Sequence, residues 1–103
     1  MTSISKERWW TLPLALQLGS IGSEVGRAAK WQDRDKTAFW GAVARALELF
    51  ELTRTDRRWE SRRSELNRAQ ETFADAVLGG REYQSNLADL EHYFLPFAIR
   101  ANK

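Results

Sequence analysis

Residues 14–31 read LALQLGSIGSEVGRAAKW, and the spacing of their apolar residues indicates the fold class. Its large apolar side chains recur at alternating spacings of four and three residues, which is the period of one face of an α-helix. These side chains are Leu14, Leu18, Ile21, Val25 and Ala28. We predict a helix from Leu12 to Trp31, with Thr11 as its N-cap and Pro13 in its first turn.

A second stripe of the same helix almost lacks side chains. It consists of Ala15, Gly19, Gly22, Gly26 and Ala29. Three glycines inside a helix cost roughly 2–3 kcal/mol relative to alanine, so we expect close packing against another helix to compensate. That helix belongs either to the same chain or to a second copy, and the sequence leaves both alternatives open. The glycine spacing does not match phosphate-binding loops.

A second helix is predicted from Lys36 to Arg54, with Asp33 or Asp35 as its N-cap. Its apolar stripe contains Phe39, Val43, Ala46 and Phe50. Trp40 and Leu47 widen this stripe, so we expect both side chains to face inward.

A third helix is predicted from Arg57 to Leu78, ended by the Gly79-Gly80 pair. Its inward face contains Trp59, Leu66, Ala69, Phe73 and Ala76. A fourth helix, capped by Ser85, carries Leu87, Leu90, Phe94 and Phe97. Because proline lacks a backbone donor and clashes with the preceding turn, we expect this helix to be shortened or kinked at Pro96.

The absence of alternating strand patterns and of long repeats makes the predicted fold class all-α. The chain has 103 residues, which suits a single helical domain (1–103), with residues 1–8 as a flexible tail. Short connections favour antiparallel neighbours, so we predict an up-down-up-down four-helix bundle.

One arginine interrupts an otherwise apolar line of the second helix. Arg45 follows Ala42 and precedes Leu49 on that line, and an unpaired buried charge is costly. Glu24 is the leading acidic partner. The alternative is an anion pocket in which Arg27 and Arg45 hold a carboxylate or phosphate and Glu24 positions them.

Arginines and tryptophans are concentrated near the start of the third helix and at the N-terminus. Residues 54–68 contain six arginines and three acidic residues. The candidate contact surface consists of Trp9, Trp10, Arg57, Arg58, Trp59 and Arg62. Exposed tryptophans are typical of protein interfaces, whereas aromatic rings interleaved with arginines also bind nucleic acids. The sequence supports both interpretations.

Composition argues against several classes of protein. The chain has no cysteine, which excludes disulfides and thiolate chemistry, and His92 is its single histidine. We find no signal peptide, no membrane span, and no motif for catalysis, metals or cofactors. The net charge is +2, too small for a uniformly basic surface. We therefore expect a cytoplasmic protein that is not an enzyme and has no cofactor.

Two resemblances accompany these patterns. The run from Ile21 to Trp31, together with Arg45 to Phe50, resembles a set of short bacterial proteins without an assigned activity, which implies a stand-alone bacterial domain. The small helical architecture is similar to that of the HEPN family, whose ribonucleases carry an arginine five to seven positions before a histidine. Ser85, Asn86 and Leu87 occupy those positions here, so the resemblance implies no nuclease activity.

The glycine stripe and the five tryptophans favour a protein that works through contacts with other proteins, as a homodimer or with another protein partner. The alternative function is binding of RNA or single-stranded DNA at the arginine- and tryptophan-rich end.

Overall fold

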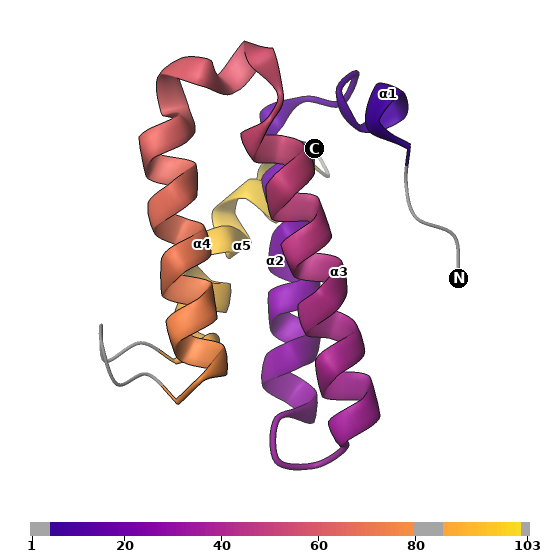
Figure 1. Cartoon of the computed structure of the whole chain (residues 1–103), viewed down its shortest axis with the longest axis vertical. Coiled ribbons are helices and arrows are strands. Elements are labelled where there is room, and N and C mark those ends of the chain that lie inside the picture. Colours follow the sequence, from indigo (N-terminus) through magenta and orange to yellow (C-terminus); the bar gives the residue numbers. More distant parts are fainter. Residues whose placement is uncertain (1–4, 80–85, 102–103) are drawn as a thin grey trace.

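A computed structural model describes residues 5–79 and 86–101, the stretch 97–101 by its backbone alone (Figure 1). Every element within these ranges is helical, so the all-α prediction is confirmed for the described part of the chain. The elements are α1 (Lys6–Trp9), α2 (Leu14–Trp31), α3 (Lys36–Arg54), the 3₁₀ helix η1 (Arg57–Arg62), α4 (Arg63–Val77) and α5 (Leu87–Ala101).

The boundaries of α3 agree with the prediction because its start is encoded locally. The Asp35 carboxylate accepts a hydrogen bond from the Ala38 backbone amide at 3.1 Å, which caps the helix. The predicted start of α2 is wrong. Pro13 is extended and serves as its N-cap residue, while the Thr11 hydroxyl donates to the Arg8 carbonyl at 2.7 Å. The helix α1 lies partly within the segment for which we expected a tail.

The predicted third helix is divided into η1 and α4. Trp59 has non-helical backbone angles (φ −107°, ψ 21°), and Asp56 caps η1 by accepting from the Arg58 amide. The chain therefore crosses the end of the molecule as a 3₁₀ helix before α4 begins (Figure 1). Gly79 has a φ of 109°, which agrees with its predicted role after the helix. Gly80 lies outside the described residues.

The last helix does not end at Pro96. Asn86 precedes α5 and accepts a hydrogen bond from the Asp89 amide at 2.8 Å, whereas the predicted cap, Ser85, lies outside the described residues. Pro96 and His92 are both exposed, so water can satisfy the His92 carbonyl that loses its helical donor. The helix can continue for this reason.

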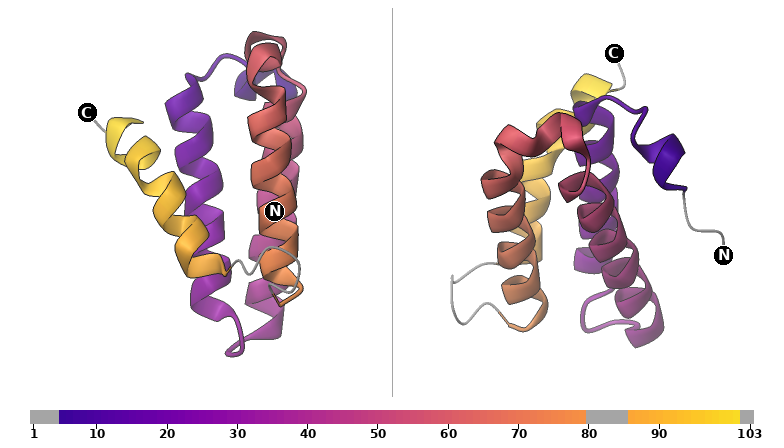
Figure 2. Two further views of the ribbon diagram at one scale, coloured as in Figure 1. Left: turned by 90° about the vertical axis from the view of Figure 1, so that its left-hand side faces the viewer. Right: turned by 45° about the horizontal axis from the view of Figure 1, so that its top comes forward.

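The central helix of the fold is α2. It packs most extensively against α5 on one side and against α3 on another, and α5 is inclined to it (Figure 2). The helix α4 contributes Leu66, Phe73 and Ala76 to the core. The Phe50 ring lies 5.7 Å from that of Phe73 and 6.0 Å from that of Phe94, which joins α3, α4 and α5.

Candidate functional site

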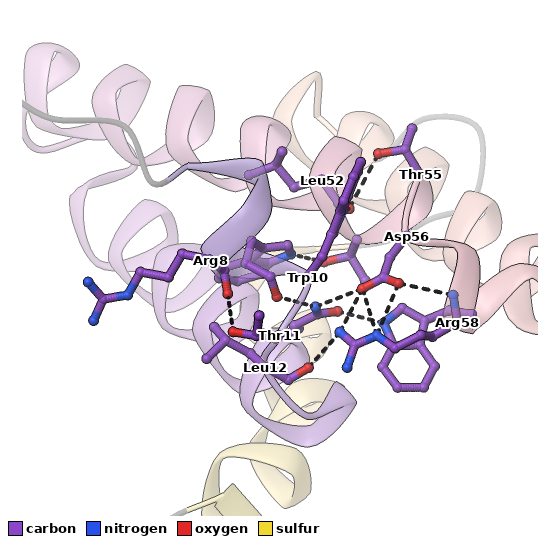
Figure 3. Close-up of polar contacts among 12 residues, drawn as sticks. Arg8, Trp10, Thr11, Leu12, Leu52, Thr55, Asp56 and Arg58 are labelled. Atoms are coloured by element: carbon purple, nitrogen blue, oxygen red, sulfur yellow. Dashed lines mark hydrogen bonds and ion pairs between the residues drawn. The ribbon is translucent and has the colours of Figure 1, made fainter.

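Three tryptophans of the predicted contact surface come together where α1, α2, α3 and η1 meet. The Trp9 indole donates to the Thr53 hydroxyl at 2.9 Å, and the Trp59 indole donates to the Gln17 side-chain oxygen at 2.8 Å. The Trp10 indole donates to the carbonyl oxygen of Leu52 at 2.9 Å (Figure 3). All three indole donors are therefore used within the chain.

Gln17 and Asp56 form the buried centre of this network. The Gln17 amide donates to the Trp9 carbonyl at 2.8 Å and to the Asp56 carboxylate at 3.2 Å. The same carboxylate accepts from the Arg58 guanidinium at 2.7 Å and from the Arg58 amide at 3.0 Å. A further guanidinium hydrogen bond, at 2.7 Å, ties Arg58 to the Leu12 carbonyl (Figure 3). This network fixes the segment before α2 against the turn after α3.

The charge state of Asp56 follows from these contacts. Burial by itself raises the pKa of its carboxyl group, but hydrogen bonds from Arg58 and Gln17 outweigh burial and hold the pKa below its ordinary value. Hydrogen bonding to Asp56 in turn raises the pKa of Arg58. The pair is therefore ionised at neutral pH and serves to connect the chain segments.

The predicted surface is used mainly for this internal network. Trp9 is buried, and the Arg58 guanidinium lies 4.5 Å from the centre of the Trp59 ring, over its face. Arg62 is exposed and forms an ion pair with Glu65 at 3.2 Å. Arg57 is exposed on η1. The six predicted residues thus divide into a tryptophan–Arg58 network and two surface arginines.

Sequence reasoning missed Gln17 and Thr53, which are both fully buried polar residues. A usable signal existed for Gln17, because it lies one helical turn from both Leu14 and Ile21 on the apolar face of α2. A polar residue in that position needs a buried partner. Only the fold shows that its partners come from α1, the turn before η1, and η1 itself.

The predicted charge cluster is also assembled. Glu24 is buried, and its two carboxylate oxygens accept from different arginines. Arg45 of α3 donates at 3.0 Å, and Arg27 of α2 donates at 2.9 Å. This geometry agrees with the structural ion pair rather than with arginines left open for an external anion.

The glycine stripe of α2 faces α5 at two positions. A Cβ atom on Gly22 would lie 2.5 Å from the Cβ of Phe94, and one on Gly26 would lie 2.5 Å from a carboxylate oxygen of Glu91. Of the other members, Gly19 is buried, and Ala15 and Ala29 are half-buried. At Gly22 and Gly26 the absent side chains therefore permit close packing within the chain.

A groove of about 270 Å³ separates α4 from α5. Ala69 and Leu90 contribute apolar surface to it, and Tyr93 also lines it. Burial raises the pKa of Tyr93, and so does the Glu65 carboxylate, which accepts a hydrogen bond from the tyrosine hydroxyl at 3.2 Å. Asn86, the first described residue of the α5 region, lines the groove as well.

The outer face of α3 differs from the prediction. Trp40 is 51% exposed and Leu47 is 38% exposed, so the expectation that both face inward is wrong. The neighbouring helices cover the arc of α3 that carries Phe39 and Ala46, and Trp40 and Leu47 lie outside it. Exposed residues on this outer face recur at spacings of four, four, three and four residues. We call this set the α3 stripe. Its members are Lys36, Trp40, Ala44, Leu47 and Glu51.

Comparison with known proteins adds no family assignment. No protein-family model matches this chain, and no curated protein or solved structure is significantly similar to it. Within residues 5–79 and 86–101, none of the helices combines the length and apolar character needed to cross a bilayer. The same residues contain no group of three or more histidine, aspartate or glutamate side chains able to hold a metal ion.

Proposed function

We propose that this protein acts through protein–protein contacts and self-associates, and that it is not an enzyme. The observation that carries the proposal is the apolar centre of the α3 stripe, where Trp40, Ala44 and Leu47 are exposed on one helix face. Exposed aromatic residues adjoining other apolar residues are typical of protein interfaces.

The other tryptophans strengthen the argument for Trp40. Trp9, Trp10 and Trp59 each use the indole donor within the chain, and Trp31 packs against the core. The Trp40 ring contacts that of Phe39, at 4.9 Å between ring centres, yet half of the Trp40 surface remains exposed. A contact with another protein would bury that surface.

The architecture that we propose for this role is the up-down-up-down four-helix bundle. The short 32–35 connection between α2 and α3 supports it, as does the way in which η1 carries the chain across one end to α4 (Figure 1). Among the described residues, the exposed side chains of Trp40 and Leu47 lie on a face of α3 that such a bundle leaves accessible to a partner.

The test compares the wild-type protein with a Trp40→Glu variant by native mass spectrometry and sedimentation velocity. We expect the wild type to form defined multiples of 11.9 kDa at micromolar concentration, and the variant to be monomeric with unchanged helicity. Leu78→Glu is the matched control, because Leu78 is 77% exposed and lies outside the α3 stripe. A wild-type chain that stays monomeric at high micromolar concentration and copurifies with no partner contradicts the proposal.

A second candidate function is binding of RNA or single-stranded DNA. Arg54, Arg57 and Arg63 line a pocket of about 550 Å³ where α3, η1 and α4 meet, together with Glu60, and three guanidinium groups beside one carboxylate favour phosphate contacts. We expect Arg57→Ala and Arg63→Ala to weaken binding of a single-stranded oligonucleotide and to reduce its salt dependence. Unchanged affinity and salt dependence in both variants would exclude this pocket as the binding site.

A further inference from the structure

The order of residue types along the α3 stripe is complementary to the same order read in the opposite direction. It begins with a basic residue, continues with Trp40, Ala44 and Leu47, and ends with an acidic residue. The basic residue is Lys36 and the acidic residue is Glu51, and both are exposed. A second copy of the stripe in the opposite direction would therefore meet each charge with the opposite charge.

Both charges are unfavourably placed within their own helix. The N-terminus of a helix carries a partial positive charge and the C-terminus a partial negative charge, so acidic residues suit the first turn and basic residues suit the last. In α3 the lysine is the first residue and the glutamate lies in the last turn. Glu51 forms an ion pair with Arg54, which offsets its position, but the helix itself gives no reason for Lys36.

The spacing permits both contacts with one axis of symmetry. Trp40 and Leu47 are centred on the point between Val43 and Ala44, and so are Lys36 and Glu51. A twofold axis that runs beside the outer face of α3, perpendicular to the helix and level with that point, places Trp40 opposite Leu47 of the second copy and Lys36 opposite its Glu51. The small side chain of Ala44 lies beside the axis, where it allows close approach of the two helices.

We propose that the α3 stripe binds the α3 stripe of a second copy in antiparallel orientation, about a twofold axis level with the point between Val43 and Ala44. This inference rests on the proposed function and specifies its partner and its geometry. The seam from Lys36 to Glu51 is roughly 22 Å long, at about 1.5 Å per residue. An interface of a single helix pair is small, so we expect a dissociation constant on the order of micromolar.

Exchanging the charges tests the orientation. At low salt, sedimentation equilibrium should show that Lys36→Glu and Glu51→Lys each weaken dimerisation by about tenfold, because two attractive contacts per dimer become repulsive. The double variant Lys36→Glu/Glu51→Lys should regain most of the affinity. Loss of the Arg54 contact cannot explain that recovery, since both Glu51→Lys and the double variant lack it.

Two controls separate the interface from folding and from net charge. At a protein concentration low enough to keep every variant monomeric, circular dichroism should show melting temperatures equal to or above that of the wild type for Lys36→Glu and for the double variant, since both improve the charge placement along α3. Glu71→Lys makes the same change in net charge as Glu51→Lys at an exposed position of α4, and it should leave dimerisation unchanged.

Cross-linking tests the position of the axis. The chain has no cysteine, so Ala44→Cys introduces a single thiol. Because a disulfide requires Cα atoms within about 7 Å, mild oxidation should convert this variant to a covalent dimer. Ala74→Cys is the matched control: it is the same substitution, exposed on α4, and should remain mostly monomeric.

The outcomes distinguish the inference from the proposed function. If the wild type self-associates and Trp40→Glu does not, yet the double charge exchange gives no recovery and Ala44→Cys cross-links no better than Ala74→Cys, the antiparallel geometry is wrong and the function stands. If the wild type is monomeric and binds no other protein, both are wrong. Recovery together with selective cross-linking supports both.

Discussion

Replacing Gly22 by alanine should force α2 and α5 apart. An added Cβ would lie 2.5 Å from the Cβ of Phe94, an atom that moves only with its backbone. Ordinary van der Waals contact begins near 3.4 Å, so α5 would have to withdraw by about 0.9 Å at this point. Phe94 is fully buried against Phe50, and its displacement would disturb the core that α5 helps to close.

The magnitude follows from two opposing effects. Alanine is favoured over glycine in a helix by about 1 kcal/mol, whereas overpacking of a tight contact costs about 1–3 kcal/mol and sometimes more. Because the contact at Gly22 is with a Cβ atom at 2.5 Å, overpacking there should cost about 2–3 kcal/mol, so we expect Gly22→Ala to lower the free energy of unfolding by about 1–2 kcal/mol. At Gly26 the added atom would meet a carboxylate oxygen of Glu91, which is exposed and can rotate away. Gly26→Ala should therefore be neutral or stabilising by up to about 1 kcal/mol.

Thermal and urea unfolding, followed by circular dichroism, measures both variants under the same conditions. In a domain of this size 1 kcal/mol changes the melting temperature by about 4–8 °C, so the two variants should differ by roughly 5–20 °C. The pair is matched, because it makes the same substitution one turn apart on the same stripe. If Gly22→Ala melts at or above the temperature of Gly26→Ala, the inferred contact of α2 with α5 is wrong.

Two further predictions concern the buried charges. Hydrogen bonds hold the pKa of Asp56 in the folded protein below its ordinary value of 3.8. The ionised Asp56 carboxylate therefore makes its full contribution to the free energy of unfolding above pH 3.8. That contribution is lost as the pH falls through the lower pKa of the folded state. The stability difference between wild type and Asp56→Asn should therefore shrink between about pH 5 and about pH 2 in urea titrations; a constant difference would contradict this. Arg45→Met should lower the free energy of unfolding by at most about 1 kcal/mol, because Arg27 still forms an ion pair with Glu24. A decrease above about 3 kcal/mol in the same assay would show that Arg27 alone does not compensate the buried charge of Glu24.

The parts of the fold that were predictable depend on neighbours in sequence. The boundaries of α3 follow from its apolar period and from the Asp35 cap. Asp35 lies only three residues before Ala38, whose backbone amide donates a hydrogen bond to the Asp35 carboxylate. The division at Trp59 was not predictable, because it accompanies contacts of Trp59 and Asp56 with Gln17, which lies far away along the chain. The inward orientation expected for Trp40 was wrong. Apolar periodicity identifies which face of a helix is buried, but it does not show how much of the helix surface the neighbouring helices cover.

The candidate sites divide in the same way. The ion pair of Glu24 with Arg45 was predictable, because a charge on an apolar line requires a partner and few acidic residues lie on a suitable face. The partner of the glycine stripe was not, since its period shows that a close contact exists without identifying the other helix. The α3 stripe emerges only when buried and exposed members of one helix are distinguished.

Local patterns were enough to identify the all-α fold class of the described residues and the two ends of α3, because helix periodicity and capping act over three or four residues. The contact of Gly22 with Phe94, the link from Trp9 to Trp59 through Gln17 and the exposure of Trp40 arise only from packing between helices. Each of these depends on residues distant in sequence and on how much of a helix surface its neighbours cover, and a local pattern contains neither.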